Sequence, residues 1–305
     1  MRDILEYRTL SKLRSTYCDG LLKVIGEDGR IRSTLNQTET RTGRISSTEP
    51  NLQNIPVRSP LGREMRKFFV ARDGYVLVDA DYSQIELRVL AHISGDQNMI
   101  KAFNDNTDIH TVTASEVFDM PPQLVTPIMR SRAKAVNFGI VYGIGAFSLA
   151  KDIGVSRSEA DEYIKGYLRH YSGVDKYMHD VVEKAKKDGY AETMFARRRY
   201  LPELTASNAN TRAFGERVAR NMPIQGTAAD IIKIAMIRVY ERLERENLAA
   251  KLIMQVHDEL IVEAPENEKE RVSALLKEEM ENAVKLSVAL TADVHSGRTW
   301  YDAKG

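Results

Sequence analysis

The sequence predicts an α+β fold in which a mostly antiparallel sheet, built from both ends of the chain, is interrupted by a helical insertion. A strand-like apolar run occurs at 75–81, and further runs occur at 252–256, 260–264 and 289–295. The chain between 89 and 220 has helical periodicity instead. Because the strands of one sheet must pair, the two ends of the chain have to meet around the insertion.

Length and composition narrow the class of protein. The 305 residues are enough for two or three structural units around a substantial core. A single cysteine, Cys18, excludes an internal disulfide framework and a cysteine-cluster metal site. No apolar run approaches the ~18 residues that span a bilayer, and the N-terminus lacks a signal-peptide core. We therefore expect a cytoplasmic, monomeric protein with no membrane partner.

The N-terminal part of the chain is expected to contain one helix, one long loop and the first strand of the sheet. Residues 1–25 predict a helix, because apolar residues recur there at helical spacing. A turn at 26–29 follows, flanked by strand-like pieces. Residues 36–62 are rich in Thr, Gly, Ser, Asn and Pro, which predicts a long ordered loop of the kind that usually serves function. The buried strand at 75–81 leads into a helix at 83–93.

Several local signals place the remaining elements. Prolines at 121, 122 and 127 separate the preceding helices from a helix at 128–142, and Ser156 and Glu159 form a capping-box pattern. Two apolar runs around 257–259 predict a strand hairpin with its acids at the turn. The other expected elements are a long amphipathic helix at 226–246, a last helix at 269–286 and a last strand at 289–295.

Two acidic segments carry the first candidate chemistry. Asp81 follows the buried strand and Asp258 lies in the hairpin turn, so both can lie at one edge of the sheet. Carboxylates near a core are costly unless a cation pairs with them. Such a pair can hold two Mg²⁺ ions ~4 Å apart, which complete their shells with water and phosphate oxygens. Glu259 is a third candidate, although an adjacent hairpin residue normally points elsewhere. The alternative is a salt-bridged pair of surface acids.

A basic helix carries the second candidate chemistry. Arg130, Lys134, Phe138 and Tyr142 are each four residues apart, so one helix face presents two cations and then two aromatic rings. Cations suit the phosphates of a nucleotide, and aromatic rings suit its sugar and base. The alternative is a packing helix, but a core helix would not place Arg and Lys on its aromatic face.

The charge distribution is uneven although the net charge is only +1. The stretch from Arg41 to Arg72 contains seven basic residues and two acidic ones, and a second basic block follows at 197–220. Acidic residues gather between 263 and 281. Such a distribution can supply a phosphate-tracking surface on a neutral protein. The alternative is that these side chains coat solvated faces.

These segments resemble the polymerase region of family A DNA polymerases. Residues 81–88 resemble the family's motif A, 130–143 its motif B and 256–259 its motif C, and further stretches match at 42–47, 50–56 and 223–230. The matches run in family order across nearly all 305 residues. The resemblance implies a right-hand polymerase architecture, with a palm of mostly antiparallel sheet and helices and a helical fingers insertion.

The resemblance divides the chain into a helix at 1–25 like the end of the thumb, a first part of the palm at 26–88, the fingers at 89–220 and a second part of the palm at 221–305. Full-length members carry a thumb and an exonuclease-like domain before this region. We expect both to be absent here. Without the exonuclease-like domain the chain would not proofread, and without the thumb its synthesis would be distributive.

The resemblance also implies roles for individual residues. Catalysis would rest on Asp81, Asp258 and Lys134, and the metal ligands would be Asp81, Asp258, the Tyr82 carbonyl and Glu259. The dNTP would contact Arg130, Lys134, Phe138, Tyr142, His110, Glu86 and Gln84. In the family, Glu86 would be the steric gate against a 2′-hydroxyl, and Phe138 would favour deoxy over dideoxy substrates. DNA would contact Arg44, Asn51, Gln53, Arg217, Asn221, Gln225 and His257.

The implied function is template-directed addition of dNTPs to a primer 3′-hydroxyl by phosphoryl transfer. The cofactors would be two Mg²⁺ ions, with Mn²⁺ as a possible substitute, and the partners would be primer–template DNA and dNTPs. The alternative is a primer–template binding fragment with little activity without a thumb, and reverse transcription also stays open. Asp79 stands where the family has a small or apolar residue. It shares a strand face with Asp81, so it either adds charge near the metals or lies peripherally.

Overall fold

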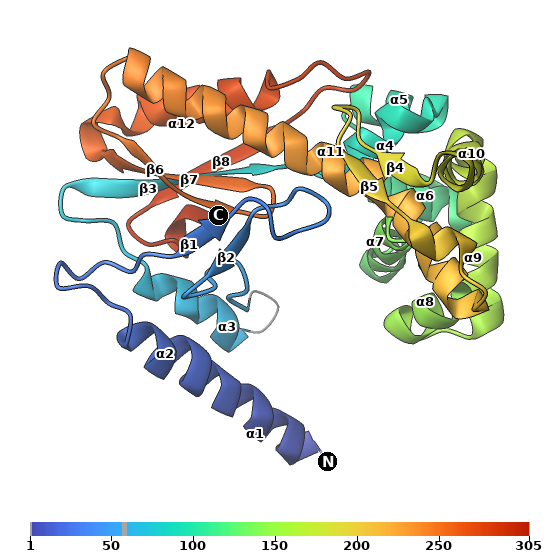
Figure 1. The fold of residues 1–305 in the computed structure, drawn as a ribbon, viewed down its shortest axis with the longest axis horizontal. Coiled ribbons are helices and arrows are strands. Elements are labelled where there is room, and N and C mark those ends of the chain that lie inside the picture. Colours follow the sequence, from blue (N-terminus) through green and yellow to red (C-terminus); the bar gives the residue numbers. More distant parts are fainter. Residues whose placement is uncertain (1, 57–59, 305) are drawn as a thin grey trace. The chain divides into compact units, whose positions relative to one another are not determined.

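The structure is a computed structural model that describes residues 2–56 and 60–304. The chain forms two compact units (Figure 1). Unit 1 contains Met1–Tyr82, Ile232–Ala283 and Thr291–Gly305, and unit 2 contains Ser83–Ile231 and Val284–Leu290. Both units draw on distant parts of the sequence, as the discontinuous sheet prediction requires.

Unit 1 is built around a four-stranded antiparallel sheet in the order β6-β7-β3-β8. Its strands are β3 (Tyr75–Tyr82), β6 (Lys251–Val256), β7 (Glu259–Pro265) and β8 (Ala292–Gly297). The predicted hairpin is confirmed as β6–β7, and the last strand begins at Ala292 instead of 289. The predicted mixed fold with an antiparallel sheet is therefore confirmed.

The two faces of the sheet are covered differently. Successive side chains of a strand point to opposite faces, so Val78, Ala80 and Tyr82 lie on one face of β3. Helix α12 (Lys269–Glu281) lies across the sheet on that side (Figure 1), and the Tyr82 hydroxyl donates a hydrogen bond of 2.6 Å to the Met280 carbonyl. Helix α12 ends at Glu281, so the predicted end at 286 is wrong. Leu77, Asp79 and Asp81 point to the other face.

The N-terminal residues form a continuous helical segment, which confirms the predicted helix, although it ends at Leu22 and the predicted end at 25 is wrong. It consists of α1 (Arg2–Lys12), a π-helical stretch (Leu13–Cys18) and α2 (Asp19–Leu22). Its second half packs into unit 1 through the buried side chains of Tyr17 and Leu21. Its first half exposes Ile4 and Tyr7 to solvent.

The expected long loop at 36–62 is only partly a loop. Short strands β1 (Thr34–Asn36) and β2 (Ser46–Thr48) pair with each other, and α3 (Pro60–Glu64) begins before the predicted end of the loop. Three-residue strands are too short to produce a recognisable periodicity, which is why the sequence did not indicate them. Residues 57–59 of this prediction lie outside the described residues.

Unit 2 is mostly helical, which confirms the predicted helical insertion. The capping box is present: the Ser156 hydroxyl accepts from the Glu159 amide at 3.2 Å, and the Glu159 carboxylate accepts from the Ser156 amide at 2.9 Å. The helices are α4 (Ile85–Ser94), α5 (Gln97–Asn104), α6 (Ile109–Val117), α7 (Pro127–Val141), α8 (Ala146–Ile153), α9 (Arg157–His170) and α10 (Ser172–Asp188). A small hairpin follows, formed by β4 (Tyr190–Glu192) and β5 (Arg198–Tyr200).

Helix α11 (Ala209–Arg245) contributes residues to both units. The predicted start at 226 is wrong, because the helix begins much earlier and continues through Pro223. A proline lacks one helical N–H and usually breaks a helix, so the sequence alone favoured a later start. None of the helices in 2–56 and 60–304 is long and apolar enough to cross a membrane.

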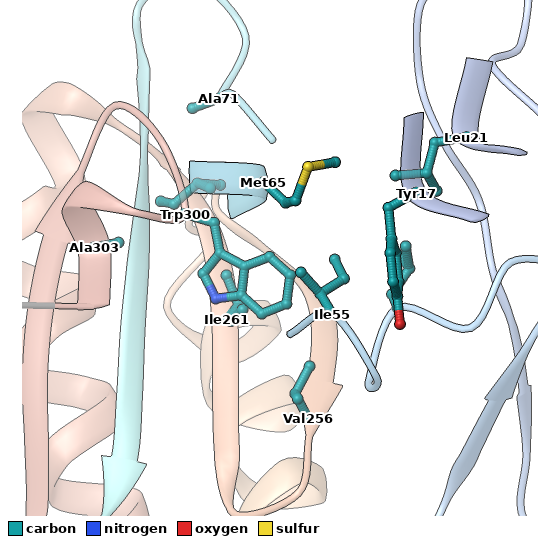
Figure 2. Close-up of a cluster of buried hydrophobic side chains, with 11 residues drawn as sticks. Tyr17, Leu21, Ile55, Met65, Ala71, Val256, Ile261, Trp300 and Ala303 are labelled. Atoms are coloured by element: carbon teal, nitrogen blue, oxygen red, sulfur yellow. The ribbon is translucent and has the colours of Figure 1, made fainter. Parts of the chain in front are cut away.

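Trp300 is at the centre of the core of unit 1. Figure 2 shows its indole among Ile55, Met65, Val256 and Ile261. The Arg66 guanidinium lies 4.2 Å from the centre of the indole, which adds a cation–π contact. Ala303 is buried in the same cluster, so the segment after β8 is fixed to the sheet by apolar packing.

We expect Trp300→Ala to lower the free energy of unfolding of unit 1 by about 3–5 kcal/mol, because it leaves a large cavity in this cluster. Hydrogen exchange of the β3 and β7 amides would measure the loss without relying on tryptophan fluorescence. Tyr240→Ala is the control, since that ring is 58% exposed. A loss no greater than that of the control would contradict the central position of Trp300.

Candidate active site

Three carboxylates gather on one face of the sheet in unit 1. Asp79 and Asp81 lie two residues apart on β3, and Glu259 begins β7 directly opposite Asp81. Asp79 is only 2% exposed, and Glu259 is also buried. Asp79 therefore belongs to the cluster, and the alternative that placed it peripherally is wrong. The expectation that Glu259 points elsewhere is wrong too, because strand pairing turns it to the face of Asp81.

Lys304 provides the cation of this cluster. Its ammonium lies 2.8 Å from Asp81 Oδ2 and 3.7 Å from Asp79 Oδ1, and it also contacts the Glu259 carboxylate. The buried Ala303 beside it holds the backbone in place. Sequence reasoning missed Lys304, because it lies in no motif and meets its partners across 45 or more positions of sequence.

The cluster brings three carboxyl groups together with one ammonium group. Burial, together with the charges of Glu259 and Asp81, raises the pKa of Asp79 to about 8, although Lys304 opposes this shift. Burial also raises the pKa of Glu259, again against the effect of Lys304. Burial alone would lower the pKa of Lys304, but the three carboxylates raise it well above its usual value, so the ammonium stays charged.

Each of the three carboxylates also has a buried oxygen without a hydrogen-bond partner among the described residues. These oxygens are Asp79 Oδ2, Asp81 Oδ1 and Glu259 Oε1. Buried oxygens of this kind fit a further cation. Within the part of the chain that the structure describes, no three His, Cys, Asp or Glu side chains form a metal site by themselves. Mg²⁺ remains compatible with the cluster, since one or two carboxylates are enough for it when water and phosphate complete the shell.

Asp258 lies in the β6–β7 turn at the same end of the sheet as Asp81. Its carbonyl accepts a hydrogen bond of 3.1 Å from the Tyr82 amide, which ties the turn to the end of β3. The preceding residue, His257, has a left-handed backbone with φ of 53°. The prediction that the two aspartates share one edge of the sheet is confirmed. Because Asp79 and Glu259 are buried beside Asp81, a simple pair of surface acids does not describe the site.

Several predicted DNA-binding residues surround this turn. The Gln53 amide group donates 3.2 Å to the carbonyl of Gln255, and the Gln255 amide group donates 2.6 Å to the carbonyl of His257. Asn51 supports the same segment, because its side-chain oxygen accepts a hydrogen bond of 3.0 Å from the backbone N–H of Gln53. Burial lowers the pKa of His257, and the positive charge of Arg44 lowers it further. The charge of Arg44 thus acts on the His257 imidazole.

In unit 2, helix α7 and the residue that follows it carry the two basic and two aromatic side chains that were predicted to share one helix face. Arg130 and Lys134 are exposed, Phe138 is half-buried and Tyr142 is 44% exposed. The Arg130 guanidinium donates two hydrogen bonds to Asp108, at 2.5 and 3.2 Å. Burial raises the pKa of Asp108, but hydrogen bonds from Arg130, Thr111 and the His110 amide outweigh it and lower the pKa to about 2. The aspartate thus holds Arg130 in place.

His110 lies beside this face on α6. Its ring centre is 5.9 Å from that of Phe138. Burial lowers the pKa of His110 to about 4, and the charges of Arg130 and Lys134 act in the same direction, against Asp108. The imidazole is therefore neutral at physiological pH.

Three of the remaining predicted residues of unit 2 contact the end of α7 at Tyr142 and Gly143. The Tyr142 hydroxyl donates 3.0 Å to the carboxylate of Glu86, which is buried in the first turn of α4. Asn221 donates 3.2 Å to the Tyr142 carbonyl. Arg217 packs against Gly143. Glycine is favoured at this position because its φ is +66° and because a Cβ there would lie only 3.3 Å from Arg217 Cγ. Gln84 precedes α4 in a left-handed conformation, and Gln225 is half-buried in α11.

The low pKa of His110 makes a prediction about stability. In the unfolded chain His110 takes up a proton near pH 6.5, whereas in the folded chain it does so near pH 4. Between these two pH values the unfolded state therefore binds more protons than the folded state. The contribution of His110 to the stability of the folded state is lost as the pH falls from 6.5 to 4. The unfolding free energy of the parent relative to His110→Gln should decrease across this window.

Urea unfolding at several pH values, followed by circular dichroism, would measure this difference. The control is His179→Gln, since the His179 side chain is 77% exposed. A parent–variant difference that stays constant from pH 7 to pH 4 would contradict the buried neutral state of His110.

Comparisons with known proteins relate nearly the whole chain to one family. The sequence pattern of DNA polymerase family A matches residues 1–302. DNA polymerase I of Caldicellulosiruptor bescii is 53% identical over 302 residues, which cover 99% of this chain and 36% of that protein. DNA polymerase I of Geobacillus stearothermophilus is 54% identical over 303 residues, which cover 99% of this chain and 35% of that protein.

A solved structure is also similar. It is the POL domain of Pol1 from M. smegmatis in complex with DNA primer-template and dNTP, with 46% sequence identity and a TM-score of 0.96. The match covers 100% of this chain and 54% of that chain. The chain thus spans about a third of the length of these two curated relatives, at 36% and 35%.

Proposed function

The chain belongs to DNA polymerase family A, and we propose that it forms the polymerase centre of a template-directed DNA polymerase. The observation that carries the proposal is the carboxylate cluster at the end of β3, with Asp81 and Asp258 at one edge of the sheet. The solved relative is described as a complex with DNA primer-template and dNTP. We propose the same ligands for this chain.

The reaction would be transfer of a nucleotidyl group from a dNTP to the primer 3′-hydroxyl. Divalent metal ions, when bound, supply charge stabilisation at the attacking and leaving oxygens. Asp81 and Asp258 would hold them, with the Tyr82 carbonyl and Glu259 as further ligands. The family accepts Mg²⁺ in this role, and Mn²⁺ is a possible substitute.

The triphosphate would be bound by the cationic half of the α7 face. Arg130, held by Asp108, would present its remaining N–H groups to phosphate oxygens, and Lys134 would place an ammonium beside them. Lys134 would hold a proton at Nζ that it gives to the departing pyrophosphate. Here the protein mainly positions groups and stabilises charge, as in other phosphoryl transfers.

The aromatic half of the α7 face, with Phe138 and Tyr142, would select the sugar. The hydrogen bond from Tyr142 fixes the Glu86 carboxylate, which would exclude a 2′-hydroxyl. Phe138 would pack on the deoxyribose, and Gln84 would lie near the nucleotide through its position before α4. A rigid Glu86 matters here, because a steric gate works only if the blocking group cannot move aside.

DNA-binding residues are proposed in each unit separately. Arg44, Asn51, Gln53 and His257 would serve from unit 1, and Arg217, Asn221 and Gln225 would serve from unit 2. Minor-groove acceptors are nearly the same for all correct base pairs, so such contacts can test the shape of a pair without reading its sequence.

Primer extension on a labelled primer–template with Mg²⁺ and all four dNTPs tests the proposal. We expect the parent chain to extend the primer and Asp258→Asn to lose activity at least ~100-fold, because one stabiliser of the transition-state charge is removed. Asp73→Asn is the matched control, since its side chain is fully exposed on the same unit.

Primer–template binding should be measured beside extension. A folded parent that binds primer–template but does not extend it would contradict the enzyme and favour a binding role. Equal extension on an RNA template would widen the proposal to reverse transcription.

Lys304 makes a separate prediction about metal binding. Its ammonium already contacts Asp81 and Glu259, so it competes with any divalent ion for the same oxygens. Lys304→Gln should therefore bind Mn²⁺ roughly tenfold more tightly in the absence of DNA and nucleotide, equivalent to about 1.4 kcal/mol. Electron paramagnetic resonance of free Mn²⁺ would measure the affinity, with Lys277→Gln as the exposed control. Unchanged or weaker binding would contradict the competition.

A further inference from the structure

A chain of buried hydrogen bonds lies behind His110. The Tyr171 hydroxyl is 3.3 Å from Thr113 Oγ1, Thr113 Oγ1 is 3.1 Å from Asn137 Oδ1, and Asn137 Nδ2 is 3.0 Å from His110 Nδ1. None of these four residues is more than 2% exposed. The chain joins α6, α7 and the start of α10, all in unit 2.

The direction of these hydrogen bonds follows from the donors available. A neutral imidazole has one donor nitrogen and one acceptor nitrogen, and the other members limit which is which. In one direction Tyr171 donates to Thr113, Thr113 donates to Asn137 Oδ1, and Asn137 donates to His110 Nδ1. Each of the three hydrogen bonds then has one donor and one acceptor, and the imidazole proton is on Nε2, outside the chain.

The opposite direction leaves a donor unsatisfied. It would need His110 Nδ1–H to donate to Asn137, Asn137 to donate to Thr113, and Thr113 to donate to Tyr171. The Tyr171 hydroxyl hydrogen would then have no acceptor among the described residues, although the side chain is fully buried. A buried donor without a partner is costly, so the first direction is favoured.

We propose that Asn137 is a positioning residue that fixes His110 in the Nε2–H tautomer, so that His110 is a neutral hydrogen-bond donor at Nε2. A triphosphate offers only acceptor oxygens to such a donor. This inference rests on the proposed function where it assigns that ligand, but the tautomer itself does not depend on it. The contact of His110 with Phe138 places the ring beside the proposed nucleotide face.

The chemistry of residue 137 explains why an amide is needed. An asparagine can donate to His110 and accept from Thr113 at the same time. An aspartate has nearly the same shape, but its carboxylate only accepts. Asn137→Asp would therefore require a proton on Nδ1 and would convert His110 to the Nδ1–H form or to the imidazolium.

Long-range ¹H–¹⁵N correlation spectra of histidine-labelled protein test the proposal at pH 7. We expect the parent to have His110 in the Nε2–H form, with the signal assigned by its loss in His110→Gln. In Asn137→Asp the Nδ1 nitrogen should become protonated. Asn210→Asp is the matched control, because Asn210 is exposed on the same unit. A parent in the Nδ1–H form, or an unchanged tautomer in Asn137→Asp, would overturn the proposal.

Thr113→Val provides a second variant in case Asn137→Asp does not fold. It removes the hydroxyl that fixes the Asn137 amide, so both tautomers of His110 should become populated. A single unchanged Nε2–H form in folded Thr113→Val would count against the chain of hydrogen bonds.

Steady-state primer extension connects the tautomer to the nucleotide. Asn137→Asp should raise the KM for dNTP about tenfold with a smaller change in kcat, as expected for a lost contact to bound substrate. An Nε2–H parent that extends no primer would contradict the proposed function and leave the role of Asn137 standing. An Nε2–H parent whose dNTP KM is unchanged by Asn137→Asp would overturn the assignment of the triphosphate to His110.

Discussion

The gathering of three carboxyl groups at the end of β3 is the constraint on which unit 1 depends. Buried carboxylates such as Asp79 and Glu259 are costly to hold, and the sheet brings them within reach of Asp81. Lys304 supplies the compensating charge, but it does not pair with every oxygen of the cluster. The site therefore has one cation in place and three buried oxygens left without a partner among the described residues.

The apolar core beside the cluster makes this balance possible. Trp300 and Ala303 are packed against Ile261 and Leu77, the apolar neighbours of the acidic residues on the same face of the sheet. Their burial fixes the backbone from which Lys304 extends. The hydrophobic effect thus holds in place a group of charges that would otherwise repel one another, and the cost of the charged site is met by packing that takes no part in the chemistry.

Local patterns in the sequence predicted the elements that carry the candidate site residues, but not the contacts between distant parts of the chain. The β6–β7 hairpin and the face of α7 follow from periodicity over short stretches, so Asp258, Arg130 and Lys134 could be placed early. Lys304 meets Asp81 across 223 positions, and no local pattern encodes such a contact. The partners of Asn137 lie on other helices, so the sequence marked the residue within a motif without indicating its hydrogen bonds.

The candidate site residues of the two units differ in charge. Unit 1 presents an excess of carboxylates, which suits cations, and α7 of unit 2 presents Arg130 and Lys134, which suit phosphates. His110 adds to this group a donor without charge, because its imidazole is neutral. A charged imidazole would be stabilised by Asp108 but opposed by burial, Arg130 and Lys134. Burial beside two cations is therefore the physical reason that this position remains a neutral donor.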